Sequence, residues 1–279
     1  MGLAEDIRHV VEEFVATSAS NVSEEGGKYF VEPLVGFADI RDPIFKDLKD
    51  IIGGFHWTPA EALKRAGFDN VTKGSVISCV FPINPDTILS NRNEGRFPSR
   101  RWAHTRNFGE MFITALKERL VEFLAGEGFL AVAPPSLDGW KMLRDERVGY
   151  ASPWSERHVA YAAGLGTFSL NDGLITERGM SHRLGSVVTN AELPYNQRAF
   201  DNYRANCLTF ADEKCGACIK RCPTGALSPD GHDKDLCKNY CYGDLMGEKA
   251  KEYGVKVTGC GLCQTRVPCE RQNPVAGKK

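Results

Sequence analysis

The distribution of cysteine is the feature of this sequence that most constrains its fold. Nine of the ten cysteines lie between Cys207 and Cys269, and only Cys79 stands apart. A stretch this rich in cysteine is either a disulfide framework or a metal site, and cytosolic thiols are kept reduced. The first residues of the chain show no export signal. The pattern therefore favours a metal site.

Spacing within this stretch indicates which metal group it holds. Cys215, Cys218 and Cys222 are followed directly by Pro223, which gives C-x2-C-x3-C-P, the second half of a bacterial ferredoxin run. In such runs the last cysteine ligates the other of two clusters. Structural zinc also uses paired C-x2-C loops, but the Cys-Pro step after a three-residue gap favours iron–sulfur chemistry. We therefore predict two [4Fe-4S] clusters.

Crossed ligation divides the cysteines between two cluster sites. One site takes Cys207, Cys215, Cys218 and Cys269. The other takes Cys222, Cys260, Cys263 and one cysteine from the intervening stretch, either Cys237 or Cys241. Because no cysteine stands three residues before Cys215, Cys207 must reach its cluster across a longer loop.

Charge and hydropathy argue against some classes of partner. The chain has 35 basic and 36 acidic residues, and its formal net charge of -1 gives no general attraction to nucleic acid or to anionic membranes. Its apolar runs are shorter than the ~20 residues that a membrane helix needs. We expect a cytoplasmic protein with no membrane partner.

The part of the chain before the cysteines predicts a separate unit with its own core. Apolar positions at helical spacing predict helices over residues 3–17 and 109–125. Short apolar runs bounded by turn residues predict buried strands at 34–37, 76–81 and 129–133. Strands that alternate with helices indicate an α/β or α+β layered fold.

Two further expectations concern organisation. The inner face of the second helix should carry Met111, Leu116, Leu120 and Leu124. A polar stretch at 190–206 should link a layered α/β core, residues 1–200, to a ferredoxin-type segment, residues 201–279.

A glycine-rich stretch lies between the predicted core and the cysteines. A helix is expected to end at Gly164, and a turn and a strand follow. Glycine lets the backbone approach a ligand closely, although an ordinary helix end followed by a hairpin has the same pattern.

The sequence here resembles that of a known family. The strings A-A-G-L-G at 162–166, N-D-G-L-I-T at 171–176 and R-L-G-S-V-V-T at 183–189, followed by C-P-T-G-A-L at 222–227, are similar to those of epoxyqueuosine reductases and reductive dehalogenases. The resemblance implies an α+β fold, with a nitroreductase-like layered core followed by a two-cluster ferredoxin-like segment. It also implies cobalamin as a cofactor beside the two [4Fe-4S] clusters.

The same resemblance assigns site residues. It places a corrinoid against Gly164, Leu165, Gly166, Thr167 and Asn171. It makes Tyr150 the proton donor, because a tyrosine takes this role in the dehalogenases, with Arg183 as a possible partner of the phenolate. It also selects Cys237 over Cys241 as the remaining cluster ligand.

The resemblance carries expectations about partners as well. It implies a low-potential electron donor, such as ferredoxin or flavodoxin, and a small-molecule substrate. The chain ends at Lys279, without the helical-repeat extension that resembles a tRNA-binding element in epoxyqueuosine reductases, so we expect no tRNA partner. The alternative function is an electron-transfer or activating iron–sulfur protein without corrinoid chemistry of its own.

Overall fold

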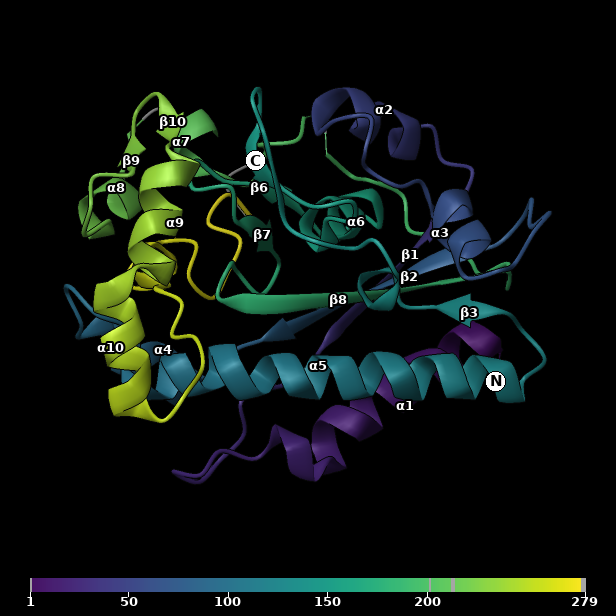
Figure 1. Ribbon diagram of the computed structural model, residues 1–279, viewed down its shortest axis with the longest axis horizontal. Helices are drawn as coiled ribbons and strands as arrows, with labels where there is room; N and C mark the ends of the chain where they lie inside the picture. The colour runs from purple at the N-terminus through teal and green to yellow at the C-terminus, as the bar shows by residue number, and fades with distance from the viewer. Residues whose placement is uncertain (1, 201, 212–213, 277–279) are drawn as a thin grey trace.

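A four-stranded antiparallel sheet lies at the centre of the structure, a computed structural model that describes residues 2–200, 202–211 and 214–276 (Figure 1). The strands run in the order β1 (Leu34–Asp39), β2 (Ser75–Pro82), β8 (His182–Thr189) and β3 (Ala131–Val132). Strands β2 and β8 pair from Ser75 opposite Thr189 to Pro82 opposite His182. Every residue of β2 is buried, as expected for a strand covered on both faces.

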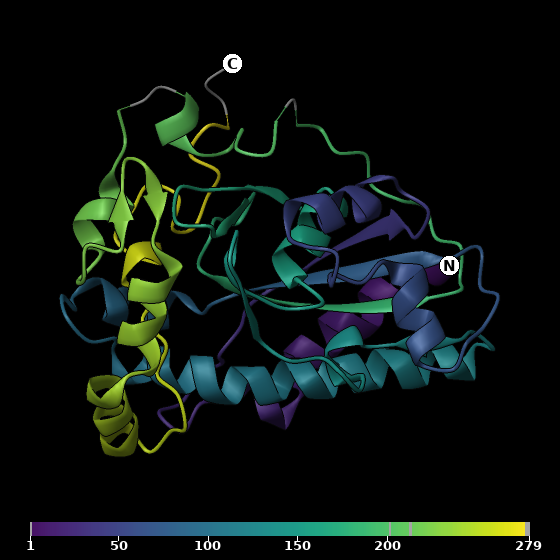
Figure 2. The same ribbon diagram turned by 45° about the horizontal axis from the view of Figure 1, so that its top comes forward.

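Helices cover both faces of this sheet (Figures 1 and 2). One face packs on α1 (Leu3–Thr17) and α5 (Arg100–Gly126), and the other packs on α2 (Ile44–Ile51), α3 (Pro59–Arg65) and α6 (Glu156–Ala162). Each face has its own apolar core, so the sheet is a shared wall between two hydrophobic layers.

Helix α5 shows how the sequence specifies a long element. Ser99 caps its start by accepting a hydrogen bond from the Trp102 backbone, and Leu116, Leu120 and Leu124 are buried as predicted. Met111 was placed on the same face, but it is 63% exposed, so that prediction was wrong. The reason is geometric, because five residues carry Met111 about 140° around the helix from Leu116.

The other elements before residue 200 are short. They are η1 (Ala19–Asn21), α4 (Pro85–Arg92), η2 (Pro134–Ser136), and the hairpins of β4 (Leu143–Asp145) with β5 (Gly149–Ala151) and β6 (Gly166–Phe168) with β7 (Leu174–Thr176).

The segment that carries the cysteines lies at one end of α5 (Figure 1). Its elements are α7 (Leu208–Ala211), α8 (Ala217–Arg221), β9 (Leu227–Ser228), β10 (Gly231–His232), α9 (Lys234–Tyr242), α10 (Asp244–Tyr253) and η3 (Leu262–Gln264). The His104 side chain on α5 is hydrogen-bonded to the Tyr253 carbonyl at 2.8 Å, which joins α10 to the core.

The observed elements agree with most of those predicted. The helix at 3–17 and the strands at 34–37 and 76–81 are confirmed by α1, β1 and β2. The helix predicted from 109 begins earlier, at Arg100, and the strand predicted at 129–133 shrinks to the two residues of β3. The mixed helix and sheet class is confirmed. The boundary at 200/201 stays a prediction, and residue 201 lies outside the described part of the chain.

No helix in the described ranges, 2–200, 202–211 and 214–276, has the length and apolarity that crossing a membrane requires.

Candidate functional site

The nine clustered cysteines gather around two hollows. The smaller hollow is lined by what we call the first cysteine group: Cys207, Cys215, Cys218 and Cys269. The larger one is lined by the second cysteine group: Cys222, Cys237, Cys241, Cys260 and Cys263. These groups match the sets that crossed ligation assigns, with both candidates for the last place in the second. Cys79 is instead buried in the core of the sheet.

Burial disfavours the thiolate form of two cysteines in the first group, Cys218 and Cys269. Burial raises the pKa of Cys218 to about 11 and that of Cys269 to about 12, and neighbouring cysteines add to both shifts. Leu170 and Met180 of the core pack against these side chains. A bound metal deprotonates a coordinating thiol outright. The donor set therefore suits a metal cluster. In the residues described, no group of three or more His, Cys, Asp or Glu is arranged to hold a single metal ion.

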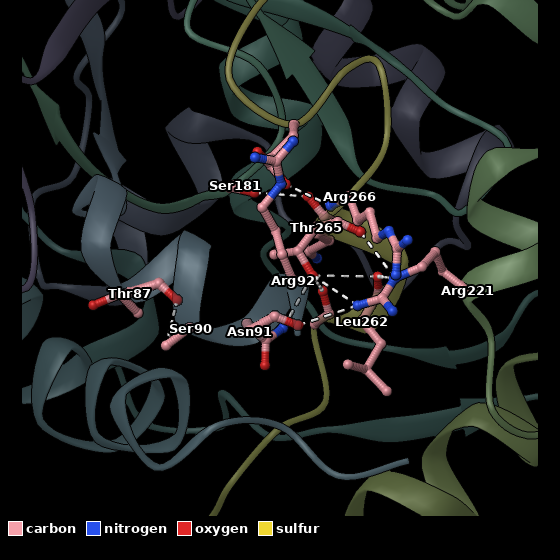
Figure 3. Close-up of polar contacts among 12 residues, drawn as sticks. Thr87, Ser90, Asn91, Arg92, Ser181, Arg221, Leu262, Thr265 and Arg266 are labelled. Atoms are coloured by element: carbon pink, nitrogen blue, oxygen red, sulfur yellow. Dashed lines mark hydrogen bonds and ion pairs between the residues drawn. The ribbon is translucent and has the colours of Figure 1, made fainter. Parts of the chain in front are cut away.

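Arg221, the last residue of α8, ties the two cysteine loops together (Figure 3). Its Nε donates to the carbonyls of Leu262 and Thr265 at 3.2 and 3.1 Å. Its terminal nitrogens donate to the carbonyls of Glu94 at 2.7 Å and Asn91 at 3.1 Å, on the α4 side. One side chain thus joins α8, the η3 loop and the core. This role could not be predicted from the sequence, because an arginine before a cysteine has no distinctive spacing.

Two core loops also hold the cysteine segment. The Asn171 side chain donates to the Cys263 carbonyl at 3.0 Å, and the Met180 backbone N–H donates to the Cys269 carbonyl at 2.8 Å. The loop of Asn171 therefore positions a residue of the second cysteine group, and the loop of Met180 positions a residue of the first.

The glycine-rich turn lies mostly inside the protein. The residues predicted to contact a corrinoid were Gly164, Leu165, Gly166, Thr167 and Asn171. Thr167 is fully buried and its hydroxyl accepts from the Asn206 backbone at 2.8 Å. A Cβ on Gly166 would lie 2.4 Å from the Ile175 carbonyl oxygen, so this glycine serves strand packing. Within the described ranges, Asn171 is the one residue of the five that lines the larger hollow.

The larger hollow is a cavity between the second cysteine group and the core. It encloses about 1430 Å³ of empty space, its open mouth included. Tyr150 from β5 and Arg183 from β8 both line it, so the structure brings both predicted catalytic residues to the cysteines. Trp102 and Tyr242 add aromatic rings to its wall.

The two catalytic candidates, Tyr150 and Arg183, each have a different charged partner. The Lys238 Nζ atom lies 3.4 Å from the centre of the Tyr150 ring. Arg183, named above as a possible partner of the Tyr150 phenolate, forms an ion pair with Glu110 at 2.6 Å. Burial is the main cause that lowers the pKa of Arg183. Lys238, which sequence reasoning missed, is therefore the cation in contact with Tyr150.

Cys237 and Cys241 lie one turn apart on α9, and both face the cavity. Cys241 lies between Cys237 and Cys260, in hydrogen-bonding contact with both side chains. The contact with Cys241, followed by one with His232, lowers the pKa of Cys237 to about 5. Both cysteines therefore remain within reach of the second cluster site.

A pair of variants separates the two. If Cys237 is the ligand, Cys237→Ser should lose the second cluster or convert it to a three-iron form, because serine replaces a soft thiolate with a weakly acidic hydroxyl. Cys241→Ser should leave both clusters intact. Iron content and electron paramagnetic resonance measure the outcome, with Cys79→Ser as the control. The opposite pattern would assign the ligand to Cys241.

Sequence comparison identifies known proteins that are similar to this chain. No protein-family model matches the chain. The epoxyqueuosine reductase of Bacillus anthracis is 29% identical over 187 residues, which cover 64% of this chain and 43% of that protein. The enzyme of Listeria monocytogenes is 33% identical over 125 residues, which cover 42% of this chain and 30% of that protein. The resemblance to the epoxyqueuosine reductases is confirmed.

Solved epoxyqueuosine reductases share the fold. The structure from Streptococcus thermophilus matches with a TM-score of 0.54 and 18% identity, over 99% of this chain and 70% of that one. The matched region spans less than half the length of the curated epoxyqueuosine reductases.

One solved epoxyqueuosine reductase structure contradicts our expectation about tRNA. That structure contains an epoxyqueuosine-modified tRNA stem loop and matches with a TM-score of 0.51 and 20% identity, over 95% of this chain and 66% of that one. This finding conflicts with our expectation of no tRNA partner, which we withdraw. The expectation rested on net charge and on the missing helical-repeat extension, and net charge does not report how basic side chains are distributed.

Proposed function

We propose that this protein is an iron–sulfur reductase that uses two [4Fe-4S] clusters and a corrinoid to reduce an organic substrate. The observation that carries the proposal is the cavity shared by Tyr150 and the second cysteine group. A proton donor and an electron-transfer centre on one cavity wall are the two parts that a reductase needs. The alternative, an electron-transfer protein without corrinoid chemistry, gives Tyr150 no role there.

The cysteine groups suit the clusters in chemistry and in number. The first group offers four thiolate donors and the second offers five, so each has the four that a [4Fe-4S] cluster uses. The first would consist of Cys207, Cys215, Cys218 and Cys269. The second would consist of Cys222, Cys237, Cys260 and Cys263.

The cavity wall suits a corrinoid as well. Aromatic rings on this wall, such as Trp102 and Tyr242, can pack on a planar macrocycle. The clusters would supply electrons from a low-potential donor such as ferredoxin or flavodoxin, and the corrinoid would supply a cobalt centre that delivers them to the substrate.

The chain's own residues then handle the substrate and its proton. Tyr150 holds a proton on its hydroxyl at the cavity wall, where a phenol can act as a general acid. Lys238, against the ring of Tyr150, favours negative charge on the phenolate that remains after transfer. Arg183, fixed by Glu110, keeps a guanidinium at the same wall.

Cobalamin binding tests the proposal directly. Anaerobically reconstituted protein should shift the absorption spectrum of added cobalamin to the base-off form. Met142 is exposed and lines the cavity, so Met142→Trp should weaken binding by obstructing it. The matched control is Met111→Trp, at an exposed methionine on α5 outside the cavity lining. An unchanged cobalamin spectrum with wild-type protein would contradict the corrinoid part of the proposal.

A further inference from the structure

We infer that the cavity binds a small organic substrate through an oxyanion of the substrate, which is either a carboxylate or a phosphate group. This inference rests on the proposed function for the identity of the bound molecule as a substrate. Two observations support it. One is the set of charged side chains that line the cavity, and the other is the set of ion-pair and hydrogen-bond partners of those side chains.

Positive side chains dominate the charged lining of the cavity. The cations are Arg106, Arg157, Arg183, Lys234 and Lys238. Asp172 is the one carboxylate in the lining described, and its Oδ2 lies 3.0 Å from Nδ1 of His232. The acidic group of the wall is therefore already engaged.

The carboxylates around the cavity do not match this positive charge. Glu110 serves both Arg183, at 2.6 Å, and Arg106, at 3.4 Å. Within the described part of the chain, Arg157, Lys234 and Lys238 form no ion pair.

These three cations are held by neutral groups. Arg157 donates to the Asp172 carbonyl at 2.7 Å, and Lys234 donates to the Val148 carbonyl at 2.9 Å. Lys238 lies over the Tyr150 ring. Carbonyls and a ring face orient a cation without neutralising it, so the charge stays available to a ligand.

Arg183 adds an unused donor. Its Nε atom is buried and has no hydrogen-bond partner among the residues described. A buried donor without a partner costs free energy, and a ligand that accepts a hydrogen bond removes that cost. A guanidinium presents parallel N–H groups, a geometry that carboxylates and phosphates match.

The position of Lys238 indicates where a bound oxyanion would lie. An oxyanion bound by this side chain would lie beside Tyr150, so the substrate would be held next to its proton source.

Matched small molecules test the inference. We would titrate benzoate, phenyl phosphate and benzamide into anaerobic, reconstituted protein by calorimetry. The three share a ring and differ in charge. At least one of the two anions should bind about tenfold more tightly than benzamide, because a hydrogen bond to a charged group is stronger than one to a neutral group. Equal affinity for all three, or no binding, would overturn the inference.

A variant locates the binding site. Lys238→Met removes the charge and keeps most of the side-chain length, so it should weaken anion binding about tenfold. The control is Lys64→Met, at an exposed lysine on α3. If the cations instead balance the negative charge of the second cluster, Lys238→Met would lower the cluster's reduction potential and leave anion affinity unchanged, a result that overturns the inference.

The phosphate of cobalamin is another oxyanion that these cations could hold. Repeating the titration with cobalamin-saturated protein separates the two sources. Anion binding that persists supports a substrate site, and anion binding that disappears assigns the cations to the cofactor and overturns the inference. Benzoate binding by protein that takes up no cobalamin would support the anion site and contradict only the corrinoid step.

Discussion

Substituting phenylalanine for Tyr150 is expected to slow turnover by ~10²–10⁴-fold, the loss typical of a missing general acid. The substitution keeps the ring that packs under Lys238 and removes only the hydroxyl. Iron content and cobalamin affinity should therefore stay at wild-type values. The measurement is single-turnover reduction of a substrate, found by screening organic anions for consumption that depends on a low-potential reductant.

Two controls make the Tyr150 result interpretable. Tyr203→Phe changes an exposed tyrosine that is absent from the cavity lining, and it should leave turnover unchanged. Tyr242→Phe changes another tyrosine of the cavity wall. Wild-type turnover in Tyr150→Phe would return Tyr150 to a packing role, and a loss in Tyr242→Phe would then move the proton donor to Tyr242.

The grouping of the cysteines could be predicted because it depends on local geometry. Cys215 and Cys218 are three residues apart at the start of α8, and Cys260 and Cys263 are three apart at the start of η3, so their spacing already determines which side chains meet. The choice between Cys237 and Cys241 could not be made on the same basis. Both lie on one face of α9, and a helix brings residues four apart to the same side.

The cavity wall was largely beyond sequence reasoning. Arg106 comes from α5, Tyr150 from a hairpin and Lys238 from α9, and these elements meet only after the cysteine segment packs on the core. No spacing in the sequence relates them. The prediction for Tyr150 came from a family resemblance, and Lys238 had no comparable signal.

For the glycine-rich turn, the sequence predicts the local structure but not what the glycines contact. A positive φ of 72° at Gly164 fits the predicted end of a helix, and α6 ends two residues earlier, at Ala162. Glycine in such a turn can admit a ligand or a neighbouring strand, and the sequence pattern is the same for both. Here Gly166 admits the backbone of Ile175.

Removing one cysteine from each group should remove one cluster at a time. Cys215→Ala takes a ligand from the first group, and Cys260→Ala takes one from the second. Each variant should keep about four of about eight iron atoms, because a [4Fe-4S] cluster needs its four thiolates. The residual spectra should differ, because a different cluster remains in each. Cys260→Ala should also abolish substrate reduction, since its group lines the cavity.

The central claim is that the clustered cysteines hold two iron–sulfur clusters, and a metal and sulfide assay of the wild-type protein tests it most directly. After anaerobic reconstitution, the chain should contain about eight iron atoms and about eight acid-labile sulfides. Cys79→Ala should give the same values, because Cys79 is buried in the sheet core. Stoichiometric zinc without sulfide would contradict the account.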